Sequence, residues 1–182
     1  MSKRLSCVLI AALLSCPAAA AEVAPAKSGD YATVGLWHVS KYTRKPACFA
    51  LMALGDIATG VQYDAKTGGV QLVLFNENAT SVADGQKLKL KIIFTTGKQI
   101  DEGWGEREFT SAVGESGSRM FYSEPFTKQM LDDLAKQDYL LVQNGERLVS
   151  GAKLEQSAAM VAKLKQCSIE AAGLNKDDPF LP

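Results

Sequence analysis

The chain has 182 residues, of which 47% are hydrophobic and 22% are charged, and its 20 Lys and Arg residues balance 20 Asp and Glu residues. This length suffices for one domain with a real hydrophobic core, so disulfides are not needed in place of packing. The balanced charge argues against nucleic-acid binding, because such proteins displace counterions with a basic surface.

Residues 1–21 have the layout of a secretory signal peptide. Lys3 and Arg4 precede an apolar run over residues 5–14, and Pro17 and the small residues 18–21 follow. This order is typical of an export signal, and the apolar run is far shorter than the roughly 20 residues that span a bilayer. We expect cleavage after Ala21, a periplasmic or secreted protein, and no transmembrane span in the mature chain.

A second processing route is open at Cys16. Residues 13–16 read Leu-Leu-Ser-Cys, which resembles a bacterial lipobox in which Cys16 is lipidated and becomes the mature N-terminus. Pro17 follows this cysteine directly, and the small-residue cleavage site lies just downstream. Simple cleavage is therefore the main prediction, and a lipoprotein is the alternative.

The mature chain reads as a flexible tether over residues 22–31, rich in Ala, Pro, Ser and Gly, followed by a single domain over residues 32–182. Turns that contain glycine separate short segments of strand character, which predicts consecutive antiparallel strands. The predicted strands cover residues 33–42, 47–54, 59–64, 70–76 and 87–95. Segment 101–123 is less regular and predicts short strands over 107–110 and 119–123.

The second half of the chain predicts two helices and a hairpin. Ser123, Glu124 and Pro125 are typical of a helix start. Two strand-like runs, 139–143 and 146–154, flank an Asn-Gly pair, which is a strong hairpin signal. A last helix follows from residue 157 to about residue 172, with Met160, Leu164, Cys167 and Ala171 along its apolar stripe.

Together these elements predict an α+β fold, a twisted antiparallel sheet of about seven to nine short strands with two helices from the C-terminal half packed on one face. Processing leaves two cysteines, Cys48 and Cys167, in an oxidising compartment, so we expect them to form one disulfide. With one His and no Cys-x-x-Cys spacing, we expect no metal site and no cofactor.

Several of these features carry a family resemblance: the export segment, Trp37 in the first strand, Cys48 in the second, the hairpin that returns through Leu154, and the pattern Ser157-Ala158-Ala159-Met160-x-x-x-Leu164-x-x-Cys167. In this layout the chain resembles small exported proteobacterial proteins of unassigned function and is distantly similar to the invasion-associated locus B family. The resemblance implies a periplasmic or secreted α+β domain. Its motifs are not catalytic.

Trp104, Glu106 and Arg107 form the candidate binding loop. The sequence Trp-Gly-Glu-Arg places an aromatic plane beside an acid and a guanidinium in the glycine-rich middle of the chain. Such a set suits contacts with a sugar or a peptide.

Two other groups of residues have competing interpretations. His38 is the chain's one histidine, and it is either a structural residue or the base of a hydrolase that also uses a carboxylate of the middle segment. Lys87, Lys89 and Lys91 share one face of a strand, where they either dock an anionic surface or, as is more usual, solvate the face or protect a sheet edge.

The expected function is that of a non-enzymatic binding protein of the bacterial envelope, with an envelope protein or a glycan as its partner. The alternatives are an envelope-directed hydrolase and a lipid-anchored accessory protein.

Overall fold

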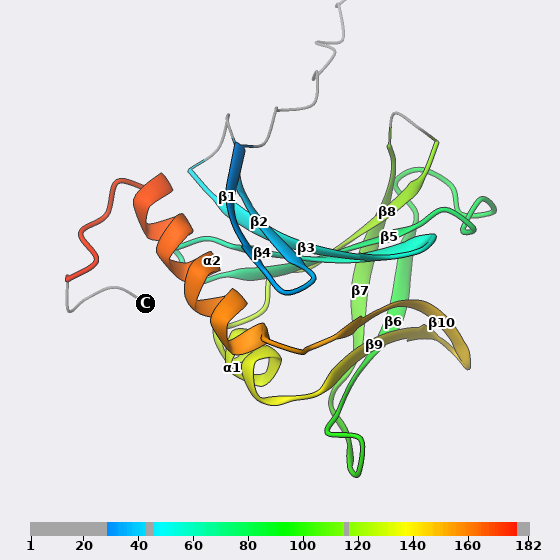
Figure 1. The fold of residues 1–182 in the computed structure, drawn as a ribbon. Coiled ribbons are helices and arrows are strands. Elements are labelled where there is room, and N and C mark those ends of the chain that lie inside the picture. Colours follow the sequence, from blue (N-terminus) through cyan, green and yellow to red (C-terminus); the bar gives the residue numbers. More distant parts are fainter. Residues whose placement is uncertain (1–28, 43–45, 115–116, 178–182) are drawn as a thin grey trace, which may run out of the picture.

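The computed structural model describes residues 29–42, 46–114 and 117–177. In these ranges ten strands form one antiparallel sheet in the order β1-β2-β3-β4-β5-β8-β7-β6-β9-β10, and two helices lie together beside it (Figure 1). The elements are β1 (Gly29–Val34), β2 (Trp37–Lys41), β3 (Cys48–Leu54), β4 (Ile57–Tyr63), β5 (Val70–Asn76), β6 (Lys87–Thr95), β7 (Ile100–Val113), β8 (Arg119–Ser123), α1 (Gln129–Lys136), β9 (Tyr139–Asn144), β10 (Arg147–Lys153) and α2 (Ser157–Ala171).

The predicted α+β class, single antiparallel sheet and two helices in the C-terminal half are confirmed. The sheet has ten strands, one more than the expected range, because the strand predicted over 33–42 is a hairpin. Its turn contains Gly35, whose φ of +57° is a conformation that glycine adopts without strain. Strand β1 begins at Gly29, inside the predicted tether.

The first helix begins later than predicted. Ser123 ends strand β8, where its Oγ accepts a hydrogen bond from the Leu72 amide at 2.9 Å. Phe126 then pairs with Val70 through two backbone hydrogen bonds, and α1 begins only at Gln129, after a turn at Lys128. The helix-start signal at residues 123–125 was therefore outweighed by pairing with β5.

The sheet curls so that its last strand meets its middle. Strand β10 contacts β4 and β5, which are not its neighbours in the hydrogen-bonded order. Side chains from those strands satisfy carbonyls of β10: Asn76 Nδ2 donates to Val149 O at 2.6 Å, and Thr59 Oγ1 donates to Gly151 O at 3.1 Å. The edge of β10 is thus covered, which protects it from pairing with another chain.

Helix α2 packs on β1 to β4 and is bonded covalently to the sheet. Cys48 of β3 and Cys167 of α2 form the predicted disulfide, with Cα atoms 5.9 Å apart and both residues fully buried. Met160 and Leu164, predicted to share the apolar stripe, are also fully buried. No helix in the described ranges is long and apolar enough to cross a membrane.

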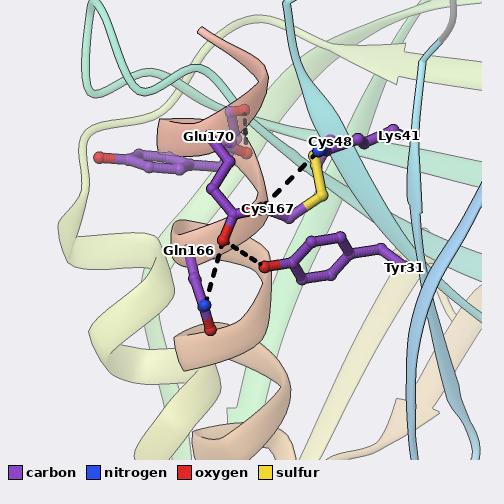
Figure 2. The surroundings of a disulfide bond; sticks show 8 residues. Tyr31, Lys41, Cys48, Gln166, Cys167 and Glu170 are labelled. Atoms are coloured by element: carbon purple, nitrogen blue, oxygen red, sulfur yellow. Dashed lines mark hydrogen bonds and ion pairs between the residues drawn. A yellow bond between two sulfur atoms is a disulfide. The ribbon is translucent and has the colours of Figure 1, made fainter. Parts of the chain in front are cut away.

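A polar cluster lies on the outer side of this disulfide, and Figure 2 shows it between α2 and the first strands. Tyr31 Oη donates to Glu170 Oε1 at 2.9 Å, Gln166 Nε2 donates to the same oxygen at 3.1 Å, and Lys41 Nζ lies 3.7 Å from Glu170 Oε2. The hydrogen bond from Tyr31 holds the pKa of Glu170 below its ordinary value. Glu170 therefore joins β1 and β2 to α2 at the surface.

Candidate functional site

The candidate site lies where strand β7 passes helix α1. The pairing of β7 with β6 is irregular here: Gly105 lies opposite Ile92 and Asp101 opposite Phe94, so extra residues of β7 bulge out between these pairs. Gly105, the paired residue that ends the bulge, has a φ of +56°, which turns the strand at that point. The bulge directs the Trp104 ring toward α1.

The Trp104 ring is held by three contacts. Its Nε1 donates a hydrogen bond to Asp133 Oδ2 of α1 at 2.8 Å. Its ring packs edge-on against Phe126, with centroids 5.4 Å apart and planes at 87°, and Arg107 Cζ lies 5.9 Å from its centroid. An aromatic ring fixed in this way loses little conformational freedom when a ligand contacts it.

A shallow recess of about 270 Å³ opens beside this ring. Its lining residues are Gly103, Trp104, Arg107, Gln129 and Asp133, which we call the tryptophan recess. Arg107 supplies guanidinium donors, Gln129 an amide that both donates and accepts, and Asp133 carboxylate acceptors. This arrangement can stack a flat apolar surface on the indole and hydrogen-bond hydroxyl or amide groups around it.

The structure brings together two of the three residues of the predicted binding loop. Trp104 and Arg107 line the same recess, whereas Glu106 lies directly opposite Lys91 on β6, on the other face of the sheet. The prediction that this segment is a loop was wrong, because residues 100–113 form one continuous strand. The bulge at Gly105 breaks the alternation that would otherwise place residues 104 and 106 on one face.

Sequence reasoning missed the contribution of helix α1. Gln129 and Asp133 stand four positions apart on α1, which places them on one face of the helix. That spacing is the only signal in the sequence, and nothing in it relates Asp133 to a tryptophan 29 positions away.

His38 lies far from the tryptophan recess in the sheet order. It is exposed on β2, where its Nδ1 is 3.4 Å from Thr33 Oγ1. Strands β3, β4, β5 and β8 stand between β2 and β7, which carries Glu106 and Glu108. The structure therefore does not join His38 to these two carboxylates, while Glu115 and the side chains of Asp101 and Glu102 lie outside the described part.

The lysine row of β6 faces acids of β7. Lys87 Nζ lies 2.6 Å from Glu108 Oε1, an ion pair that raises the pKa of Lys87, and Lys89 and Lys91 lie opposite Glu108 and Glu106 in the strand register. Strand β9 pairs with β6 over residues 91–95 only, so Lys87 and Lys89 lie on a stretch of β6 where protection of the sheet edge fits their position. The row solvates an open face of the sheet and is partly neutralised there.

Two further predictions concern a metal site and the processing of the N-terminal segment. Over the ranges the structure describes, no three His, Cys, Asp or Glu side chains gather as metal ligands. The predicted signal peptide and the lipidation candidate Cys16 lie outside the described residues.

Comparison with known proteins adds no relative, since no protein-family model, curated protein or solved structure matches this chain. The geometry of the recess is therefore the basis for a functional proposal.

Proposed function

We propose that this chain is an exported, non-enzymatic binding protein of the bacterial envelope and that the tryptophan recess binds a glycan. The observation that carries the proposal is the convergence of Trp104, Arg107, Gln129 and Asp133 on one shallow recess. The export segment and the resemblance to small exported proteobacterial proteins support the envelope location.

A glycan fits this recess better than a protein surface does. Sugar rings present an apolar face that stacks on indole and a rim of hydroxyls that need both donors and acceptors, and the recess supplies both within about 270 Å³. A protein partner would instead favour an apolar patch surrounded by polar residues. The hydrolase alternative lacks comparable support, because His38 and the carboxylates of β7 lie on separated strands.

Intrinsic fluorescence tests the proposal directly, because the chain has two tryptophans and Trp37 is fully buried. Titration with soluble peptidoglycan fragments and with neutral oligosaccharides should change the emission of Trp104. The signal should persist in Trp37→Phe and vanish in Trp104→Phe.

Calorimetry of variants then assigns the contacts. Arg107→Gln and Asp133→Asn should each weaken glycan binding about tenfold, as expected when one hydrogen bond to a charged group is lost. Arg147→Gln is the matched control, because Arg147 lies on β10 and does not line the tryptophan recess. This variant should leave the glycan affinity unchanged. Equal affinity of wild type and Trp104→Ala would refute the site, and the absence of binding to every glycan tested would refute the function.

A further inference from the structure

A second recess lies between the β9–β10 hairpin and the connection from β5 to β6. It has a volume of about 260 Å³, and we call it the hairpin recess. Its floor is the hydrophobic core: Leu90 of β6 and Phe121 of β8 line it and are each 1% exposed. Leu88 and Val82 complete an apolar interior, which is typical of sites for small apolar ligands.

The wall formed by β10 is preformed. The pairing of β10 with β9 shifts between Leu148 and Ser150, so Val149 is a bulge residue. In a regular strand neighbouring side chains point to opposite faces, but here Leu148 and Val149 both line the recess. The hydrogen bond from Asn76 Nδ2 to Val149 O holds this bulge in place, and Leu148 remains 52% exposed at the mouth.

The rim of the hairpin recess carries one charge. Its polar lining residues are Asn76, Asn78, Ser81, Asn144 and Arg147. Asn76 is engaged with Val149 and with the Asn78 amide, and Asn78 Nδ2 lies 3.3 Å from Asp56 Oδ2. Asp56 disfavours an anion on that side, whereas Arg147 and Asn144, opposite each other in the hairpin, offer donors. Glu146, beside Arg147 in the hairpin turn, is the nearest acid in sequence on that wall.

We propose that the hairpin recess binds an amphipathic monocarboxylate of medium chain length. Its alkyl chain lies on Leu88, Leu90 and Phe121, and its carboxylate binds Arg147, because a guanidinium pairs well with a carboxylate. The volume of about 260 Å³ holds about nine groups of the size of a water molecule, which limits the chain length. This site is independent of the glycan proposal.

Calorimetric titration of the mature chain with decanoate, decanol and decyltrimethylammonium tests the charge preference. Wild type should bind decanoate at least tenfold more tightly than the cationic analogue. Arg147→Gln should lose about tenfold in decanoate affinity and keep its affinity for decanol, while the matched variant Arg107→Gln in the tryptophan recess should bind decanoate as wild type does. Equal binding of decanoate and the cationic analogue, or no binding of decanoate, would overturn the proposal.

A filled recess tests the location. Ala79 is half-buried and lines the recess, so Ala79→Phe places a ring where the alkyl chain lies and should abolish binding of decanoate and decanol at an unchanged melting temperature. If this variant fails to fold, backbone amide chemical shifts of the wild type, measured by NMR during a decanoate titration, locate the binding site instead. Decanoate should perturb residues 79–90 and 144–149, and perturbations confined to other residues, or binding retained in a folded Ala79→Phe, would overturn the site.

Discussion

Single residues decide how the two halves of the sheet meet. Ser150 and Thr59 are both fully buried, their hydroxyl oxygens lie 2.9 Å apart, and Ser150 Oγ donates to Ala58 O at 3.0 Å. A buried polar group left without a partner destabilises the fold by more than its hydrogen bond stabilises it. Replacing only one residue of this pair should therefore be more damaging than replacing both by apolar residues of the same shape.

We expect Ser150→Ala to lower the free energy of unfolding by about 1–3 kcal/mol, because it leaves Ala58 O and Thr59 Oγ1 with fewer partners in a dry site. Urea unfolding monitored by circular dichroism measures this loss. Ser81→Ala, at an exposed serine, is the control and should change stability little. A loss no larger than that of the control would contradict the role of the buried pair.

Gly105 is a single residue whose backbone conformation shapes the tryptophan recess. A Cβ at this position would have open space around it, so only the backbone conformation, with φ at +56°, opposes a side chain. We expect Gly105→Ala to cost about 1–2 kcal/mol of stability and to weaken the proposed glycan binding by displacing Trp104. Gly29 also has open space around a Cβ but no positive φ, so Gly29→Ala should change neither the stability in urea unfolding nor the glycan affinity in calorimetry. Equal stability of the two variants would contradict the prediction.

At the scale of elements, α2 is joined to the first strands by a charge as well as by the disulfide. The pKa of Glu170 is lowered chiefly by the hydrogen bond from Tyr31, and Gln166 and Lys41 add to this effect while desolvation opposes it. Because the folded pKa lies below the unfolded one, the ionised carboxylate stabilises the fold above the ordinary carboxyl pKa. This contribution is lost as the pH falls through the folded pKa.

Glu170→Gln should therefore be less stable than wild type at pH 7, and the difference should shrink toward pH 3. Urea unfolding at both pH values measures it, and high salt should reduce the effect because the group is exposed. Glu146→Gln, in the exposed hairpin turn, is the control. A difference between Glu170→Gln and wild type that stays the same at both pH values would exclude ionisation of Glu170 as its cause.

At the scale of the whole molecule, the disulfide closes a loop of 119 positions and so joins the third strand to the last helix. In the chain-entropy model a loop of this length stabilises the fold by about 4–5 kcal/mol before strain is subtracted. We expect the double variant Cys48→Ala/Cys167→Ala to unfold at a markedly lower temperature than the oxidised protein. Reductant should lower the melting temperature of the wild type but not that of the double variant. A melting temperature that neither the reductant nor the double substitution changes would contradict a structural role for the disulfide.

Local signals predicted much of the fold. Segments 70–76, 87–95 and 119–123 are strands at the predicted bounds, because hydrophobic alternation and glycine turns act over a few residues. Predictions failed where a distant partner decided the outcome. Helix α1 begins only at Gln129 because Phe126 pairs with Val70, and residues 101–106 join a long strand because β6 lies beside them.

In the candidate site, too, local sequence signals predicted some features and contacts between distant residues decided the others. Trp104 and Arg107 could be singled out from their side-chain chemistry, but their grouping with Gln129 and Asp133 depends on the approach of β7 to α1 and on a bulge. The hairpin recess had no signal in the sequence, because its lining comes from strands and connections brought together only by the curl of the sheet.

The sequence by itself determined the class of fold, most of the elements and the pairing of Cys48 with Cys167, since each depends on composition, short periodicity or the count of cysteines. The tertiary structure alone decided the strand order, the face on which Glu106 lies and the two recesses. The physical reason is that non-local pairing and the curl of a sheet depend on contacts between residues far apart in the chain, which no local pattern encodes.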